Sequence, residues 1–96
     1  MDQKIQLKHP QGKKPVSMSK EKYDLLKQAI LKFFDAQRKG TFTEMVIAVE
    51  KDFKTNRTEF QGSVRWHLEW MKLDLEARKV IKRVANTAPQ QYTLFK

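Results

Sequence analysis

The spacing of the apolar residues changes twice along the chain, and this order of spacings most limits the folds that are open to it. In residues 5–7 and 16–18 apolar and polar residues alternate, and the intervening His9-Pro10-Gln11-Gly12 is typical of a turn. This pattern predicts a short N-terminal β-hairpin. From Ser19 onward the spacing becomes three and four, and after residue 78 it returns to two. The chain is therefore expected to form a hairpin, a set of helices and a second hairpin.

Three segments have helical spacing, namely residues 19–38, 43–54 and 62–78. The apolar stripe of the first segment consists of Tyr23, Leu26, Ile30, Phe33 and Phe34. Ser19 is a candidate N-cap for this helix. Gly40 is expected to end it, because glycine adopts the backbone conformation that follows many helix C-termini.

The second helix is expected to begin at Thr43, whose hydroxyl is a suitable N-cap, with Phe42 in the position of a hydrophobic staple. The last part of the chain, residues 79–95, alternates apolar and polar residues on both sides of a loop. This pattern predicts a returning pair of strands at residues 79–84 and 91–95.

The order of three helices followed by a hairpin resembles the winged-helix variant of the helix-turn-helix domain over residues 19–96. The resemblance implies a small strand at residues 41–43, a recognition helix that starts at Gly62 and a wing at residues 85–91. The fold class that we predict is mostly α with a small β component, a three-helix winged-helix domain preceded by an N-terminal β-hairpin in residues 1–18.

Three stretches of the sequence also resemble a small bacterial family of uncharacterised winged-helix-like proteins of about this length. These stretches are His9-Pro10-Gln11-Gly12-Lys13-Lys14, Gly62-Ser63-Val64-Arg65-Trp66 and Lys72-Leu73-Asp74-Leu75-Glu76-Ala77-Arg78. This closer resemblance supports the expected fold and implies no particular activity.

The composition fits one small, strongly basic domain. The chain has 96 residues, and its net charge of +9 attracts nucleic acid, an anionic membrane surface or an acidic protein. The excess lies at the two ends, since residues 1–22 and 57–96 each carry +4 and residues 23–56 carry +1. The chain has no cysteine and no apolar run long enough to span a membrane. We therefore expect a soluble, cytoplasmic protein with no membrane partner.

The third predicted helix has two apolar stripes on nearly opposite sides. One stripe consists of Val64, Leu68, Met71 and Leu75, and the other consists of Trp66, Trp70, Leu73 and Ala77. A recognition helix normally packs one face on the core and presents a polar face to DNA. Three interpretations of the second stripe remain open: the hairpins cover it, its tryptophans form a dimer contact, or they stack on nucleic-acid bases.

Basic residues suited to phosphate contacts lie around the third helix and the second hairpin. Arg65 and Lys72 have the right chemistry to contact bases or phosphates. Each, however, precedes a glutamate by four residues, Glu69 and Glu76, a spacing that pairs opposite charges on an exposed helix. The nucleic-acid-binding residues that we predict are Arg57, Arg65, Lys72, Lys79, Lys82 and Arg83.

Signals of enzymatic chemistry are incomplete in this sequence. His67-Leu68-Glu69 has the His-x-Glu spacing of zinc deaminases, but the cysteine pair of that site is missing. Gly12-Lys13-Lys14 lacks the rest of a phosphate-binding P-loop. We therefore predict a protein that is not an enzyme and that has no catalytic residues, cofactor, metal ion or small-molecule ligand.

The leading hypothesis is a small winged-helix nucleic-acid-binding protein, a transcriptional regulator that binds double-stranded DNA mainly through phosphate contacts. The alternative is a winged-helix protein-interaction or dimerisation module without DNA binding, with an interface at Trp66, Trp70 and Leu73. Acidic residues in the third helix and the absence of Lys or Arg from residues 85–89 favour this alternative. The positions of the two tryptophans discriminate between these hypotheses. Their burial against a hairpin would leave DNA binding open, and their exposure would favour protein interaction.

Overall fold

Three helices and five short strands form the fold in the computed structural model, which describes residues 3–9, 11–12 and 16–95. In chain order the elements are β1 (Lys4–Gln6), β2 (Ser17–Ser19), α1 (Lys20–Ala36), β3 (Lys39–Thr41), α2 (Phe42–Thr55), α3 (Val64–Ala77), β4 (Ile81–Arg83) and β5 (Gln91–Leu94). The predicted class, mostly α with a small β component and a hairpin before the helices, is confirmed. Pro10, which belongs to the predicted first turn, lies outside the described residues.

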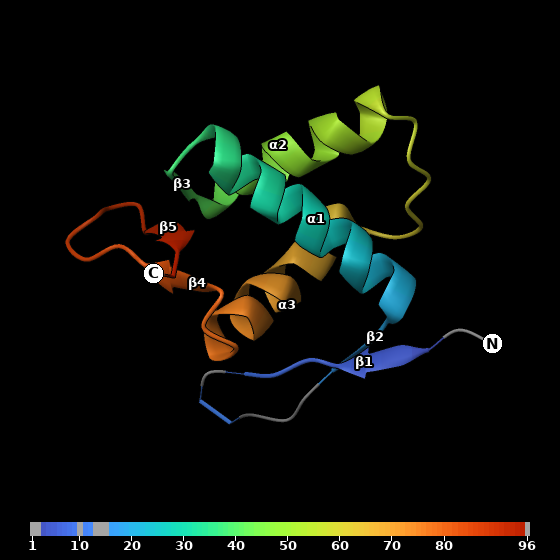
Figure 1. The fold of residues 1–96 in the computed structure, drawn as a ribbon, viewed down its shortest axis with the longest axis horizontal. Helices are drawn as coiled ribbons and strands as arrows, with labels where there is room; N and C mark the ends of the chain where they lie inside the picture. Colours follow the sequence, from blue (N-terminus) through green and yellow to red (C-terminus); the bar gives the residue numbers. More distant parts are fainter. Residues whose placement is uncertain (1–2, 10, 13–15, 96) are drawn as a thin grey trace.

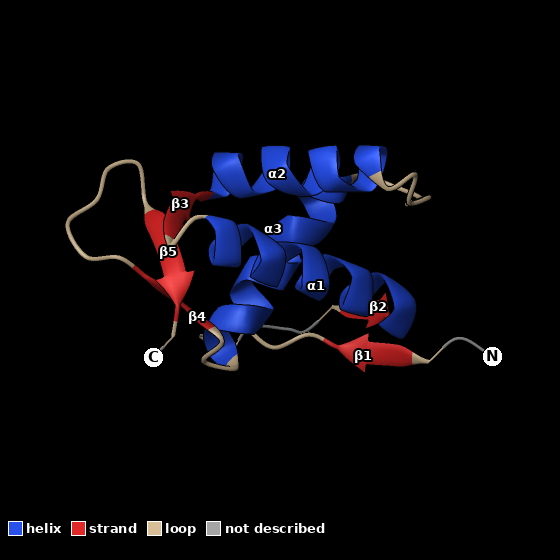
Figure 2. Ribbon diagram, turned by 45° about the horizontal axis from the view of Figure 1, so that its top comes forward, coloured by secondary structure: helices blue, strands red, loops and turns tan. Residues whose placement is uncertain are grey.

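Two small antiparallel sheets lie on opposite sides of the helices (Figures 1 and 2). One is the β1-β2 hairpin, in which Ile5 faces Met18. The other has the order β3-β5-β4, so that the last strand pairs with the short strand between the first two helices. In this sheet Tyr92 of β5 lies between Gly40 of β3 and Arg83 of β4. The small strand is thus at Lys39–Thr41, earlier than the predicted residues 41–43.

All three helices and the N-terminal hairpin contribute to one core. The fully buried side chains include Leu26 and Ile30 of α1, Met45 and Val49 of α2, and Leu68, Met71 and Leu75 of α3. Leu7, just after β1, and Met18 of β2 are buried with them. The segment before α1 therefore packs into the same core as the helices.

The N-cap of α2 is Thr41, and the predicted cap at Thr43 is wrong. The Thr41 hydroxyl accepts a hydrogen bond from the Glu44 backbone N–H at 3.1 Å, and the Glu44 carboxylate accepts one from the Thr41 N–H at 2.9 Å. This capping box satisfies two backbone donors at once, because the glutamate stands three residues after the cap. The Thr41 N–H also holds the pKa of Glu44 below its usual value. Thr43 lies within the first turn and is exposed.

Thr41→Ala is expected to lower the free energy of unfolding by about 1 kcal/mol, because it removes the acceptor for the Glu44 N–H. Thr43→Ala is the matched control and should change stability by less than about 0.5 kcal/mol. Urea denaturation of both variants measures the difference. Equal losses in the two variants would contradict the assignment of the cap to Thr41.

The prediction that Gly40 ends the first helix is wrong. The helix ends at Ala36, and the next residue, Gln37, is already extended. Gly40 lies in β3 and is buried against the Phe33 ring, where an added Cβ would come within 2.5 Å of the ring Cζ atom. The glycine is therefore required by close packing between β3 and α1.

Asp74 of α3 is fully buried and joins three parts of the chain. It accepts hydrogen bonds from the Lys8 backbone N–H at 2.8 Å, the Tyr23 hydroxyl at 2.7 Å and the Arg78 Nε at 2.9 Å. These donors come from the N-terminal segment, from α1 and from the end of α3. The Asp74 carboxylate raises the pKa of Arg78 through the hydrogen bond and its charge. Asp74 is therefore the buried polar centre that ties the N-terminal segment and α1 to α3.

Stability is expected to decrease at alkaline pH because of Tyr23. Burial, together with the hydrogen bond to Asp74, raises the pKa of Tyr23 above its ordinary value of about 10. The stabilisation from this group is therefore complete below about pH 10 and is lost as the unfolded chain ionises above it. Urea denaturation at a series of pH values should show a steeper alkaline loss in the parent than in Tyr23→Phe. Parallel curves for the two proteins would contradict this prediction.

Candidate interaction surface on the third helix

The helix α3 packs one side fully into the core. Ser63 caps it, accepting a hydrogen bond from the Trp66 backbone N–H at 3.1 Å. Leu68, Met71 and Leu75, which follow each other at three- and four-residue spacing, are completely buried. This side is the first of the two predicted apolar stripes, and its burial fixes which side of α3 points outward.

The second apolar stripe of α3 is only partly covered by the described residues. Trp66 is 51% exposed, whereas Trp70 is partly buried and packs against the core. The two rings meet edge to face with their centroids 6.4 Å apart. The His67 ring also meets Trp66 edge to face, with the ring centroids 5.0 Å apart. Leu73 is also partly buried. Complete coverage of this stripe by the hairpins, the first interpretation, therefore fails at Trp66.

The cations on one flank of α3 are held against an aromatic ring. The Lys72 ammonium lies 4.7 Å from the centroid of the Phe42 ring, and the Arg65 guanidinium lies 5.4 Å from it. Such contacts attract a cation to the ring face. The Lys72 side chain is only 16% exposed, and it forms an ion pair with Glu69 at 3.4 Å. Arg65 is the more exposed of the two cations.

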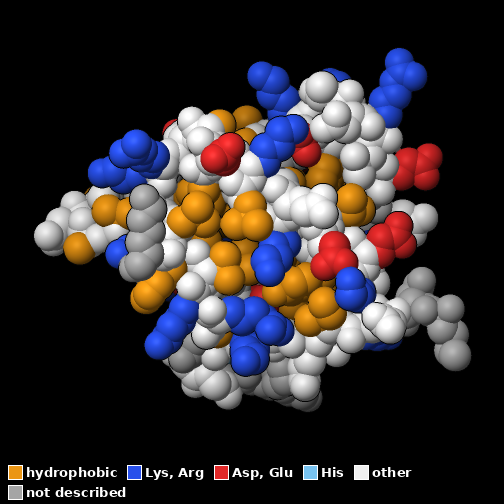
Figure 3. Space-filling view, in the orientation of Figure 1, with side chains coloured by type: hydrophobic (Ala, Val, Ile, Leu, Met, Phe, Trp, Pro, Cys, Tyr) orange, Lys and Arg blue, Asp and Glu red, His pale blue; other side chains and the backbone are white. Residues whose placement is uncertain are grey.

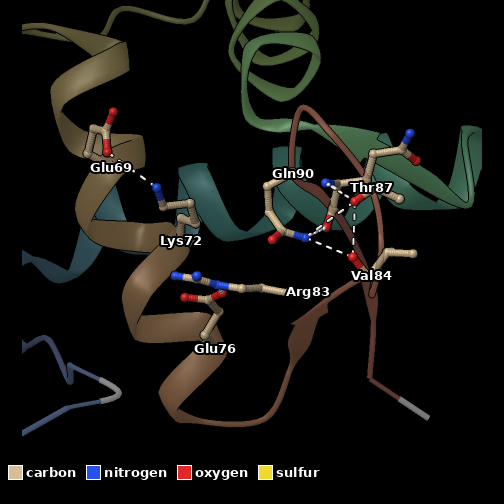
Figure 4. A network of polar contacts seen from close by, with 8 residues as sticks. Glu69, Lys72, Glu76, Arg83, Val84, Thr87 and Gln90 are labelled. Carbon is tan, nitrogen blue, oxygen red and sulfur yellow. Dashed lines mark hydrogen bonds and ion pairs between the residues drawn. The ribbon is translucent and has the colours of Figure 1, made fainter.

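The predicted ion pairs with four-residue spacing on this flank are absent from the described residues. Lys72 forms its ion pair with Glu69 rather than with Glu76. Glu76 instead pairs with Arg83 of β4, whose Nε lies 2.8 Å from the Glu76 Oε1 (Figure 4). The pairing raises the pKa of Arg83. The Glu76 side chain is 9% exposed, and its Oε2 has no hydrogen-bond partner among the described residues. Two of the predicted phosphate contacts, Lys72 and Arg83, are thus already paired with carboxylates.

The loop between β4 and β5 is stabilised by its own polar side chains. The Gln90 amide donates to the Val84 carbonyl at 2.9 Å, and the Thr87 hydroxyl donates to the same carbonyl at 3.0 Å (Figure 4). Thr87 also accepts a hydrogen bond from the Gln91 backbone N–H at 2.9 Å. The loop is therefore organised internally, and its tip, residues 85–89, offers no basic side chain.

The remaining predicted phosphate contacts, Arg57, Lys79 and Lys82, come from three different segments of the chain. Arg57 lies in the segment that joins α2 to α3. Lys79 follows α3. Arg57 and Lys79 both have a left-handed backbone conformation, with φ of 53° for Arg57 and 61° for Lys79. Lys82 points away from Arg83, since adjacent strand residues face opposite sides. It lies over the Phe95 ring and lines a groove of about 480 Å³ beside Arg38. Lys82 and Arg83 therefore point to opposite sides of β4, and Arg57 comes from a different part of the chain.

The face drawn in Figure 3 shows dispersed charge. Lys and Arg side chains are spread around it, acidic side chains lie between them, and hydrophobic atoms gather near its centre. Within the described part of the chain, no three His, Asp or Glu side chains are grouped as a metal site would need. None of the described helices is both long and apolar enough to cross a membrane.

Trp66 and its neighbours Trp70 and Leu73 are the interface residues that the sequence predicted, and the structure brings them together on the outward side of α3. The residues that sequence reasoning missed are Phe42, which holds two cations, and Asp74, which ties the N-terminal segment to α3. The four-residue spacing between Asp74 and Arg78 could have indicated that Asp74 forms an ion pair on this helix.

Comparison with protein-family models finds one match, over residues 4–92. The comparison with curated proteins gave no match. The comparison with solved structures gave none either. The matched range includes the β1-β2 hairpin, all three helices with the whole outward side of α3, β3, β4 and the first part of β5. The chain belongs to the family of unknown function DUF6958.

Proposed function

We propose that this chain is a protein-interaction module on a winged-helix scaffold, with the outward side of α3 as its binding surface. The surface consists of Trp66, Trp70 and Leu73 and is called the Trp66 face below. The observation that carries the proposal is the 51% exposure of Trp66, next to a second tryptophan that is only partly buried. Exposed groups of large apolar side chains tend to mark binding sites, and tryptophan often contributes most of the binding energy at interfaces.

The chemistry of the Trp66 face suits a protein better than a DNA groove. Base edges in the major groove are recognised mainly by hydrogen-bond donors and acceptors, and the thymine methyl is their one apolar group. Beside the Trp66 face, α3 exposes Glu69 as well as Arg65, and the charge of Glu69 repels phosphate. Lys72, which could offset it, is mostly buried and already pairs with Glu69.

The proposal is tested by capture of proteins from an extract of the source cells on the immobilised chain. Proteins that bind through the Trp66 face should be retained by the parent and by Ile47→Ala, and should be lost from Trp66→Ala. Ile47 is the matched control, because it is 61% exposed but lies on α2. Identical sets of captured proteins on the parent and Trp66→Ala would overturn the proposal.

Duplex DNA is a second candidate partner, and the unpaired basic residues favour it. Arg57, Lys79 and Lys82 are exposed and form no ion pair within the part of the chain that the structure describes. The element order also resembles that of winged-helix proteins that bind DNA. If this candidate is right, binding of a duplex oligonucleotide should weaken steeply with salt, with a slope of about 0.9 per phosphate contact. Lack of binding at low ionic strength would exclude it.

The two candidates predict different responses to the same substitutions. Phosphate contacts would be weakened by Lys82→Ala and left intact by Trp66→Ala, and the Trp66 face predicts the reverse. The absence of enzymatic activity and a cytoplasmic location stay predictions that rest on the sequence alone.

A further inference from the structure

We infer that the partner of the Trp66 face is an acidic amphipathic helix of another protein. This inference rests on the proposed function and names the chemistry of the partner. It follows from the shape of the face, from the charges that border it and from the net charge of the chain.

The shape of the face fits a helix. From Trp66 to Leu73 the face is about 10 Å long at 1.5 Å per residue, which is about two turns. The side chains of a helix form ridges that pack into the grooves of a second helix at an axial separation of about 8–10 Å. A partner helix of about two turns, with apolar residues at three- and four-residue spacing, would therefore cover Trp66, Trp70 and Leu73 together.

Exposed cations border the face on three sides. Arg65 lies on the flank next to Phe42, and Lys79 follows the end of α3. On the other flank the hydrogen bond from the Lys8 N–H to Asp74 holds exposed Lys8 beside the helix. The one exposed acidic side chain among the described residues of α3, Glu69, is paired with Lys72. Acidic residues on the rim of a partner would therefore find complementary charge around the apolar centre.

A second copy of this chain fits these charges poorly. Each copy carries +9, and a two-fold contact through the Trp66 face would bring Arg65, Lys8 and Lys79 near their own counterparts. Duplex DNA would satisfy the cations but would leave the apolar centre facing polar base edges. An acidic helix with apolar anchors satisfies both parts of the surface.

The test uses a fluorescently labelled peptide that places leucine at three- and four-residue spacing and glutamate elsewhere. A scrambled peptide of the same composition keeps the charge and loses the apolar stripe. Binding to the full chain is followed by anisotropy, with the parent, Trp66→Ala, Arg65→Glu and the control Ile47→Ala. We expect Trp66→Ala and Arg65→Glu each to weaken binding of the patterned peptide about tenfold. Ile47→Ala should match the parent, and the scrambled peptide should bind about tenfold more weakly than the patterned one.

Four outcomes would overturn the inference. Equal affinity for the patterned and scrambled peptides would show general attraction to a basic protein. Displacement of the peptide by a duplex oligonucleotide whose own binding needs Trp66 would assign the face to nucleic acid. A parent dimer in sedimentation that Trp66→Ala dissociates would assign it to a second copy. If the patterned peptide does not bind while proteins are still captured through Trp66, the inference of an acidic helix is wrong and the proposed interaction function stands.

Discussion

Replacing Asp74 by alanine is expected to lower the free energy of unfolding by about 3 to 5 kcal/mol. The substitution removes a carboxylate that is completely buried and leaves three donors without their acceptor, namely the Lys8 N–H, the Tyr23 hydroxyl and the Arg78 guanidinium. Buried donors that lose their partner cost more than the hydrogen bonds themselves contribute. Urea denaturation followed by circular dichroism measures the change.

Two variants control for this prediction. Asp74→Asn keeps the size of the side chain and an acceptor oxygen but loses the charge next to Arg78, so it should cost less than the alanine variant. Asp35→Ala removes an exposed aspartate from α1 and should change stability by less than about 0.5 kcal/mol. An Asp74→Ala variant as stable as Asp35→Ala would show that the network contributes nothing to the fold.

Gly40→Ala is expected to destabilise the chain by about 1 to 3 kcal/mol, the usual cost of overpacking. The new methyl group would lie within 2.5 Å of the Phe33 ring, which is buried and cannot move away freely. The strand β3 would then have to shift relative to α1, and its pairing with β5 would weaken. Thermal or urea unfolding of the variant gives the loss directly.

A double-mutant cycle tests whether the Phe33 ring is the cause. Phe33→Leu shortens the side chain and removes the ring atoms that an added Cβ would meet. In this background Gly40→Ala should cost less than it does in the parent, so the two substitutions should couple. Strict additivity would place the requirement for Gly40 in its backbone rather than in this contact.

The sequence predicted the order of elements well, because apolar spacing reports directly on the secondary structure that can bury one face. It did not place the start of α2, since Thr41 and Thr43 both offer a capping hydroxyl just before helical spacing begins. The glutamate three residues after Thr41 was the deciding signal. Gly40 was misread because a glycine needed for close packing looks the same in sequence as one that ends a helix.

The candidate site could be predicted only in part. The two stripes of α3 follow from spacing alone, and one of them is buried as expected. The contacts of Lys72 with the Phe42 ring and of Arg83 with Glu76 do not follow from spacing. In each contact the two residues come from different elements and meet only in the folded chain. The exposure of Trp66 likewise depends on which elements pack against α3 in the folded chain, and spacing does not reveal this.

The described chain leaves Trp66 uncovered on the outward side of α3, while Trp70 packs against the core. Quenching of tryptophan fluorescence by acrylamide tests it most directly, with Trp70→Phe reporting on Trp66 alone and Trp66→Phe reporting on Trp70 alone. We predict that Trp66 is quenched clearly more strongly than Trp70 in the isolated protein. Equally weak quenching of both residues would show that the face is covered in solution and would contradict the account.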